Sequence, residues 1–283
     1  MKVLVTGANG QLGRDVVKLL GEQYDIHGLS REELDITSED QCRKVISSLK
    51  PDIVIHCAAY TAVDEAESDA DGAYRINAIG TRNLVIAAEK THAKFCYISS
   101  DYVFDGNSTV PYQEYDNTNP QGVYGKSKRA GEWLVQSLSM RYFIVRTSWV
   151  YGLHGTNFVK TMLQLADQRD SLKVVHDQIG SPTYTLDLAR FLLQLVETER
   201  YGIYHASNTG ICSWYEFACA IFEECQKDIR VEPCKSEDFP RPAPRPKYSV
   251  MDHMAIRANG FMDLRHWREA LRDFLKELGD QSK

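Results

Sequence analysis

Lys2-Val3-Leu4-Val5-Thr6-Gly7-Ala8-Asn9-Gly10-Gln11-Leu12-Gly13 is the stretch that decides the fold of this 283-residue chain. Its first five residues form an apolar, β-branched run that predicts a buried strand, and an amphipathic pattern that predicts a helix begins near Leu12. Between them, Gly7, Gly10 and Gly13 permit a tight turn and a close approach of the backbone. A strand, a glycine-rich turn and a helix in this order are typical of a dinucleotide-binding fold.

The turn and the start of the helix predict where a pyrophosphate binds. A helix N-terminus offers free N–H groups and the positive end of the helix dipole to an anion. The Gly-x-x-Gly-x-x-Gly spacing differs from the more usual Gly-x-Gly-x-x-Gly, so a plain loop is the alternative. We assign cofactor contacts to six residues of this stretch: Gly7, Asn9, Gly10, Gln11, Leu12 and Gly13.

The end of the second expected strand, Asp25–Leu29, bears on which nicotinamide dinucleotide binds. An acidic side chain at this place normally contacts the ribose 2′-hydroxyl of NADH. Here the residues are Ser30 and Arg31, and a guanidinium pairs well with the 2′-phosphate of NADPH. We therefore predict NADPH, while Glu32 and Glu33 follow directly and keep the use of NADH open.

The next segment is extended and then enters a helix. Asp35 and Ile36 close the extended part, where Asp35 either meets the adenine or caps its own turn. Ser38 and Gln41 have the spacing of a capping box, which predicts a helix start. We include Asp35 and Ile36 among the cofactor-binding residues.

A third buried strand, Asp52–Cys57, leads to small residues that leave room for a cofactor backbone. His56 lies inside this strand and is interpreted as a hydrogen-bonded core histidine. On the following helix, expected over residues 71–90, Asn77 is either a buried bracing group or part of the site. We assign further cofactor contacts to Ala58, Ala59, Tyr60 and Asn77.

The reacting groups are predicted at the end of the next strand and on the next long helix. The strand Lys94–Ser99 leads to Ser100 and Asp101, and ligands of open α/β sheets bind outside the carboxyl ends of the strands. Tyr124 and Lys128 are four residues apart, so on a helix they project from one face. Because an ammonium favours the phenolate, we expect Lys128 to lower the Tyr124 pKa. A chance pair on a solvated helix is the alternative.

Together, Gly7-x-x-Gly10-x-x-Gly13, Ser100 and Tyr124-x-x-x-Lys128 resemble the extended short-chain dehydrogenases/reductases. Within that group the chain is similar to the dTDP-4-dehydrorhamnose reductase family over nearly its whole length. The similarity is carried by Ser99-Ser100-Asp101-Tyr102-Val103-Phe104-Asp105-Gly106, Arg146-Thr147-Ser148-Trp149-Val150-Tyr151-Gly152, Asn157-Phe158 and Asp177-Gln178-Ile179-Gly180-Ser181-Pro182-Thr183. Ser100 stands where this family usually has threonine, and either hydroxyl donates the same hydrogen bond.

The resemblance implies that a nicotinamide passes a hydride to the C4 keto carbon of a nucleotide-linked deoxysugar. Tyr124 would deliver the proton, Lys128 would hold the nicotinamide ribose, and Ser100 would polarise the carbonyl. Tyr124 and Lys128 are therefore also included among the cofactor-binding residues. Asp101 would orient sugar hydroxyls, and the product, dTDP-L-rhamnose, would feed a surface polysaccharide. The resemblance leaves a homodimer open. Asp15 and Asp187 match a magnesium site of some family members too loosely, so no metal site is predicted.

Two other functions stay open. One is another extended nucleotide-sugar enzyme, an epimerase or a dehydratase; a dehydratase needs an acidic residue next to Asp101, and Tyr102 counts against it. The other is a non-catalytic, NADP-binding regulatory subunit, because the regulatory subunit of methionine adenosyltransferase has a similar sequence. The complete set of Ser100, Tyr124 and Lys128 argues for catalysis.

The second half of the chain is expected to hold the substrate. Trp149 offers a flat wall to a sugar or a base, with plain core packing as the alternative. Asn157 opens a helix expected to end near residue 168. Pro240–Pro246 is a stiff, extended segment in which Arg241 or Arg245 meets the diphosphate, with a surface linker as the alternative. We expect a strand near 203–205 and helices over 185–198, 213–225 and 263–278. The predicted substrate-binding residues are Ser100, Asp101, Trp149, Asn157 and Arg245.

Composition limits the function classes. The chain is 43% hydrophobic and 25% charged with a net charge of −6, which is typical of an ordinary globular protein without affinity for nucleic acid or an anionic membrane surface. Seven scattered cysteines without a Cys-x-x-Cys pair predict reduced thiols, and no apolar run approaches about 20 residues. We therefore predict a cytoplasmic protein that binds small molecules.

The fold class predicted from these patterns is α/β, a Rossmann-type doubly wound parallel sheet with a smaller C-terminal α/β substrate lobe. Residues 1–150 are expected to form the dinucleotide-binding domain, which also receives roughly residues 176–200. Residues 151–283 are expected to form most of the discontinuous substrate-binding lobe.

Overall fold

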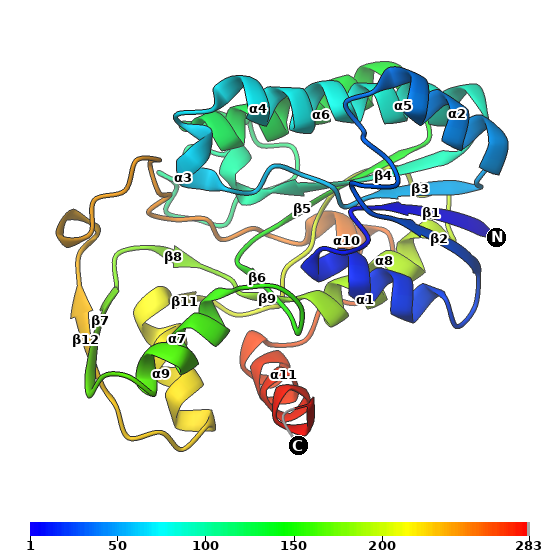
Figure 1. Ribbon diagram of the computed structural model, residues 1–283. Helices are drawn as coiled ribbons and strands as arrows, with labels where there is room; N and C mark the ends of the chain where they lie inside the picture. The colour runs from blue at the N-terminus through cyan, green and yellow to red at the C-terminus, as the bar shows by residue number, and fades with distance from the viewer. Residues whose placement is uncertain (282–283) are drawn as a thin grey trace.

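The structure is a computed structural model that describes residues 1–281, and its centre is a six-stranded parallel sheet (Figure 1). The predicted doubly wound sheet is thereby confirmed. The strands are β1 (Lys2–Thr6), β2 (Asp25–Leu29), β3 (Ile53–His56), β4 (Lys94–Ser100), β5 (Tyr142–Thr147) and β10 (Gly202–His205).

The order of the strands fixes the place of a ligand. It is β2-β1-β3-β4-β5-β10, so the chain leaves β1 toward one edge and returns to the other side of β1 with β3. In open parallel sheets a ligand binds outside the carboxyl ends of the strands at such a reversal of direction. The loops after β1, β3 and β4 are therefore the expected walls of the site.

Helices cover both faces of this sheet, as Figure 1 shows. One face is covered by α1 (Gln11–Leu20) and α8 (Thr185–Val196), and the other by α2 (Glu39–Leu49), α5 (Thr81–Lys90) and α6 (Val123–Leu138). Successive residues of a strand point to opposite faces. Val3 and Val5 accordingly pack in the core beneath α1 and α8, while Leu4 packs in the core beneath α2 and α5. Among the described helices none is both long and apolar enough to cross a bilayer.

The expected helix over residues 71–90 is interrupted. It consists of α4 (Ala70–Tyr74), a π-helical turn (Arg75–Gly80) and α5. Asn77 lies in the π-helical turn, which the sequence pattern did not indicate. Single π-helical turns often mark functional sites because they shift side chains out of register with the rest of the helix.

A second, smaller lobe lies beyond the carboxyl ends of the strands, at the lower left of Figure 1. Its helices are α7 (Phe158–Ala166), α9 (Trp214–Glu224) and α11 (Trp267–Gln281), and its strand pairs are β7 (Ser171–Val175) with β12 (Arg230–Cys234), β8 (Ile179–Gly180) with β11 (Cys212–Ser213), and β6 (Val150–Tyr151) with β9 (Thr183–Tyr184). These elements share a core of their own around Phe217, Leu271 and Phe274. The domain boundaries stay a prediction. The β7–β12 pair was not expected.

The remaining elements are short: α3 (Val63–Ala66), α10 (Met254–Ala258) and the 3₁₀ turns Asp101–Val103 and Ser236–Asp238. The final helix begins at Trp267 rather than near residue 263 because the Trp267 N–H donates to the Thr209 carbonyl at 2.9 Å, which holds the preceding residues extended. The capping box before α2 is only half formed. The Ser38 hydroxyl accepts from the Gln41 N–H, but the Gln41 side chain accepts from the Asp35 N–H instead of returning to Ser38.

Candidate active site

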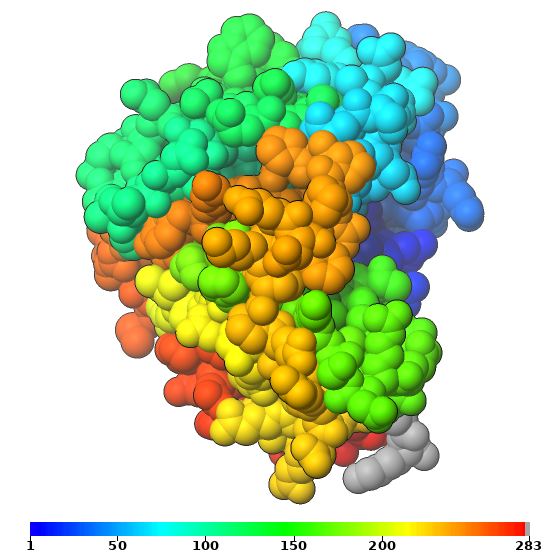
Figure 2. Space-filling model, turned by 90° about the vertical axis from the view of Figure 1, so that its left-hand side faces the viewer, coloured from blue at the N-terminus to red at the C-terminus, as the bar shows by residue number. Residues whose placement is uncertain are grey.

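The carboxyl ends of the strands enclose one large cavity. Its volume is about 1050 Å³, and the residues that line it come from the loops after β1, β2, β3, β4 and β5, from the start of α6 and from residues 149–156. In Figure 2 the blue atoms of the N-terminal residues are set back between light-blue atoms above and green atoms below. The site therefore lies where the sheet meets the smaller lobe, as the strand order requires.

The glycine turn is shaped for the close approach of a ligand. Gly7 has a φ of +68°, and a Cβ atom there would lie 2.6 Å from the Ala58 nitrogen. A Cβ atom at Gly13 would lie 2.2 Å from the Gly7 carbonyl oxygen. Gly10 is the N-cap of α1 without a side-chain cap, so the first N–H groups of the helix lie at the cavity wall. This cradle fits the pyrophosphate of a dinucleotide.

The end of the cavity next to β2 carries the residues expected to choose between NADPH and NADH. Ser30, Arg31 and Asp35 all line the cavity. The Glu33 carboxylate accepts the Ser30 N–H at 2.8 Å, and this bond lowers the Glu33 pKa. Asp35 accepts from the N–H and the hydroxyl of Thr37 and also lines the cavity, so it caps its own turn while its contact with the adenine stays a prediction. The Thr37 bonds lower the Asp35 pKa and nearby Arg31 helps to lower it, and a guanidinium at this end of the cavity suits a 2′-phosphate.

The four predicted catalytic residues meet at one wall of this cavity. Tyr124 and Lys128 lie in the first turns of α6, and Ser100 ends β4. The Ser100 hydroxyl donates to Asp101 Oδ1 at 2.8 Å and accepts from the Tyr102 N–H at 3.2 Å. Because Ser100 has a single proton, polarising a substrate carbonyl requires it to exchange its bond with Asp101. Burial raises the Asp101 pKa to about 6.

The expected lowering of the Tyr124 pKa by Lys128 was wrong. Burial raises the Tyr124 pKa well above its usual value, and the main opposing effect comes from the Ser100 hydroxyl. A phenolate in a dry environment loses its hydration, which outweighs the neighbouring donor. Tyr124 therefore keeps its proton throughout the neutral range, which suits a proton donor.

Lys128 is almost completely buried, and this burial affects its own charge. Its ammonium donates to the Ile98 carbonyl at 2.7 Å and lies 4.1 Å from the centre of the Tyr97 ring. Burial lowers the Lys128 pKa to about 7, and Glu132 opposes this fall. At neutral pH the ammonium is thus poised between its charged and neutral forms.

A buried ion pair supports this wall from behind. Glu132 is fully buried one turn after Lys128, and it accepts from Arg146 through both carboxylate oxygens at 2.8 and 2.9 Å. The Ser99 hydroxyl also donates to Glu132 at 2.6 Å. Helix α6 and strands β4 and β5 are therefore tied together at the point where Ser100 and Lys128 emerge. This pair was not predicted from the sequence, although Glu132 follows Lys128 at the same four-residue spacing that links Lys128 to Tyr124.

The chain is similar to known proteins over nearly its whole length. A family model described as RmlD substrate binding domain matches residues 1–279. The chain belongs to the RmlD family. It is 47% identical over 277 residues to the spore coat polysaccharide biosynthesis protein SpsK of Bacillus subtilis, covering 98% of this chain and 97% of SpsK.

Two further relatives carry an enzyme name. The dTDP-4-dehydrorhamnose reductase of Aggregatibacter actinomycetemcomitans is 43% identical over 286 residues, covering 96% of this chain and 97% of the relative. A crystal structure of the dTDP-4-dehydrorhamnose reductase of Bacillus anthracis in complex with NADP has a TM-score of 0.96 and 49% identity, covering 98% of this chain and 99% of that chain. The resemblance seen in the sequence motifs is confirmed.

Four predicted residues of this RmlD-family chain lie outside the cavity lining: Tyr60, Asn77, Asn157 and Arg245. Asn77 exchanges two hydrogen bonds with the backbone of Tyr60 and donates to the Ser127 hydroxyl at 2.9 Å, so it braces the wall. Asn157 caps α7 and donates to Gln11 at 3.0 Å, which joins the lobe to the glycine turn. These four assignments stay predictions.

The Arg245 side chain is held by a carboxylate and does not line the cavity. Its Nη2 donates to Asp64 Oδ2 at 2.8 Å, while the more exposed Arg241 is 3.9 Å from the same carboxylate. Arg245 also lies close enough to Tyr102, which lines the cavity, to oppose the rise of the Tyr102 pKa caused by burial. In Figure 2 this orange part of the chain crosses between the upper and lower parts of the molecule. The proline-rich segment is thus anchored at the rim of the site.

Several lining residues were not expected from the sequence: Thr37, Cys57, Thr61, Arg75, Tyr102, Thr147, Ser148 and Thr156. Thr147 is the last residue of β5 and Ser148 follows it, so the rule that assigned Ser100 to the site applies equally to them. Arg75 gave no such signal because it reaches the cavity from the π-helical turn. His56, by contrast, is the predicted core histidine, since it bonds to the hydroxyls of Thr6 and Thr81.

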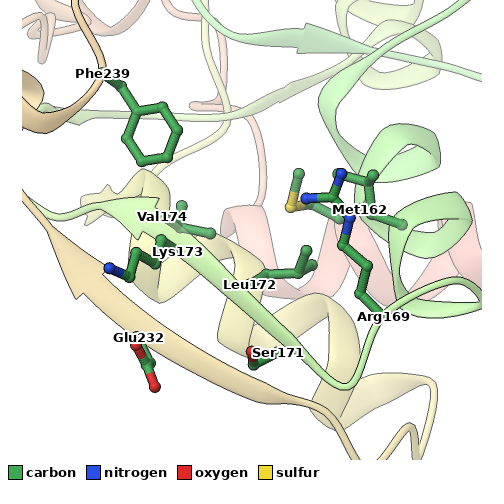
Figure 3. A pocket seen from close by; sticks show the side chains of 9 residues that line it. Met162, Arg169, Ser171, Leu172, Lys173, Val174, Glu232 and Phe239 are labelled. Carbon is green, nitrogen blue, oxygen red and sulfur yellow. The ribbon is translucent and has the colours of Figure 1, made fainter.

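A second, smaller hollow of about 330 Å³ lies on the lobe between β7 and α7. Figure 3 shows Phe239 on one side of it and Met162 with Arg169 on the other. None of the predicted site residues lines this hollow. It is separate from the cavity that contains Ser100 and Tyr124.

Proposed function

We propose that the chain reduces the C4 keto group of dTDP-4-dehydro-L-rhamnose with NADPH, giving dTDP-L-rhamnose for a surface polysaccharide. The observation that carries the proposal is the meeting of Ser100, Asp101, Tyr124 and Lys128 on one wall of a cavity with a dinucleotide cradle. Its support from relatives is the reductase name at 43% and 49% identity, one of these with NADP. The similarity to SpsK fits the polysaccharide.

Bound NADPH would supply the hydride. Gly7, Gly13 and the N-terminus of α1 would hold its pyrophosphate, and Arg31 would pair with its 2′-phosphate. As negative charge develops on the carbonyl oxygen, the Tyr124 phenol donates its proton and Ser100 donates a hydrogen bond. An alkoxide is more basic than a phenolate, so a Tyr124 with a raised pKa still transfers its proton downhill. In its protonated form Lys128, whose pKa is about 7, would hold the nicotinamide ribose and add positive charge on the Tyr124 side of the cavity.

The test of this function is an assay of NADPH absorbance with the purified chain and dTDP-4-dehydro-L-rhamnose formed in place by the upstream enzymes. We expect loss of absorbance with product formation, and a slower loss with NADH because Arg31 then has no 2′-phosphate to bind. Tight NADPH binding without turnover would contradict the reductase and favour a non-catalytic subunit. Product formation from a different nucleotide sugar alone would contradict the substrate.

The substrate diphosphate is expected to recruit Arg245. The variant Arg245→Ala should raise the KM for the nucleotide sugar by about tenfold, because a charge-assisted bond to phosphate is lost, and should leave NADPH affinity unchanged. Arg241→Ala tests the other arginine of the segment, whose side chain is 60% exposed, and a smaller rise of the KM there would assign the diphosphate to Arg245. Steady-state kinetics at varied sugar nucleotide measures both.

Asp64→Asn separates this role from plain anchoring. It releases Arg245 from its ion pair, so the KM should stay or fall if Arg245 binds phosphate. An equal rise of the KM in Arg245→Ala and Asp64→Asn would show that the ion pair only fastens the segment.

We place the reaction in the cytoplasm. All seven cysteines are free thiols, as the sequence predicted, and such thiols persist where the environment is reducing. The homodimer and the lack of nucleic-acid binding stay predictions.

A further inference from the structure

Trp149 has a backbone conformation that a bulky side chain disfavours. Its φ is +48°, in the left-handed region that mainly glycine adopts, and it lies between the end of β5 and the start of β6. Such strain persists only where the surrounding structure determines the conformation, and it often occurs at ligand sites. Trp149 lines the main cavity. Neighbouring residues must therefore hold Trp149 in this conformation.

Two residues of the lobe hold the Trp149 indole. Trp214, the first residue of α9, stacks on it with ring centroids 3.6 Å apart and planes inclined by 9°. Gly180 of β8 is packed so closely that a Cβ atom there would lie 2.6 Å from Cε2 of Trp149. The indole is thus covered by Trp214 and blocked by the β8 backbone.

Trp214 is itself fixed by its neighbours. Ser213 caps α9 in a capping box with Glu216, which determines the direction in which the helix begins. Ser213 also belongs to β11, which pairs with the β8 strand that contains Gly180. The Phe158 ring lies 4.5 Å from the Trp214 ring. The support of Trp149 is therefore one connected unit of the lobe.

We propose that Trp214 is a positioning residue for the sugar of the substrate. Stacked on Trp149, it holds that indole as a rigid apolar wall of the cavity. Trp214 does not line the cavity, so it acts through Trp149. An aromatic wall suits a 6-deoxysugar because its C–H groups and its methyl group are apolar, and a wall fixed in advance needs no ordering when the sugar binds. This inference rests on the proposed reductase function.

The test compares Trp214→Leu, Trp214→Phe and the wild-type chain. Trp214→Leu should abolish the exciton couplet that two stacked indoles give in ultraviolet circular dichroism. It should raise the KM for the nucleotide sugar about tenfold with a smaller change in kcat and an unchanged dissociation constant for NADPH. Trp214→Phe keeps an aromatic ring, so its KM should lie between those of the wild-type chain and Trp214→Leu. Trp133→Leu is the matched control, because Trp133 is 61% exposed, and it should change none of these values.

An unchanged KM in Trp214→Leu would overturn the inference, and so would equal losses of sugar and NADPH affinity that Trp214→Phe does not rescue, because they indicate general damage. If Trp214→Leu does not fold, Trp214→Phe decides: a modest rise of the KM at constant kcat supports the inference, and an unchanged KM overturns it. Absence of turnover in the wild-type chain has a different meaning, since it overturns the reductase function and the inference with it.

Discussion

Replacing Tyr124 with phenylalanine should lower kcat by about 10²–10⁴. The substitution removes the phenol proton and leaves the ring, so the packing against Tyr102, whose ring centroid is 5.4 Å away, is kept. Burial holds the Tyr124 pKa far above neutrality, so the wild-type donor stays protonated across the working pH range. The pH dependence of kcat near neutral pH should therefore show no step caused by ionisation of Tyr124. Single-turnover kinetics of NADPH oxidation measures the loss directly.

Two controls make the Tyr124 result specific. Tyr115→Phe removes the same hydroxyl from a side chain that is 68% exposed, and it should leave turnover unchanged. The NADPH dissociation constant of Tyr124→Phe should equal the wild-type value, because the pyrophosphate cradle is formed by the glycine turn and the substitution keeps the Tyr124 ring. Near-normal turnover in Tyr124→Phe would refute Tyr124 as the proton donor.

The sheet could be predicted because its signals are local. Lys2–Thr6 is an apolar, β-branched run and Asp25–Leu29 is a short extended segment after the first helix, and the structure gives both the predicted bounds. The strand Lys94–Ser100 came out one residue longer than expected. Each of these runs is bounded by turn residues or by a helix start, so the periodicity and the breaks agree.

The lobe was harder because its short strands gain their identity from pairing. Ser171–Val175 and Arg230–Cys234 form a parallel pair between segments about 60 residues apart, and neither run is strongly apolar. The Arg75–Gly80 π-helical turn likewise has no sequence signal that distinguishes it from ordinary helix. Tertiary contacts override local propensity in such segments.

In the candidate site, too, some features could be predicted from the sequence and others could not. Ser100, Tyr124 and Lys128 follow from spacing and from the strand-end rule, and the structure brings them to one cavity. The environment of Lys128 does not follow from spacing. Its burial against the Tyr97 ring and the Ile98 carbonyl depends on how α6 packs on β4, and the burial of Tyr124 itself raises the Tyr124 pKa.

Because Lys128 is buried, its replacement should change stability and activity in opposite directions. Lys128→Met should lower kcat by about 10² or more, because the positive charge on the Tyr124 side of the cavity is lost. The same variant should be more stable than the wild-type chain at neutral pH by about 1–3 kcal/mol, or about 3–8 °C in Tm. Methionine has a similar length and no charge to bury. The contacts with the Ile98 carbonyl and Tyr97 are lost and offset part of this gain.

The pH dependence of this gain follows from the Lys128 pKa. Burial lowers it to about 7 in the folded chain, whereas an unfolded lysine titrates near pH ~10.4. Below pH ~7 both states carry the proton, so the folded wild-type chain bears the full cost of a buried ammonium. As the pH rises from about 7 toward 10.4 the folded chain releases its proton and the cost fades. The stability advantage of Lys128→Met should therefore be largest below pH ~7 and shrink above it.

Thermal unfolding followed at several pH values measures this difference. Lys126→Met is the matched control on the same helix, because Lys126 is exposed and its removal should leave both Tm and kcat unchanged. A Lys128→Met variant that is less stable than the wild-type chain at pH ~6 would show that the Ile98 carbonyl, the Tyr97 ring and Glu132 together outweigh the loss of hydration. The ammonium would then stabilise the fold, and the Lys128 pKa would be raised instead of lowered. The expected result places the cost of Lys128 in stability and its benefit in turnover, which is the trade-off expected of a charge buried for catalysis.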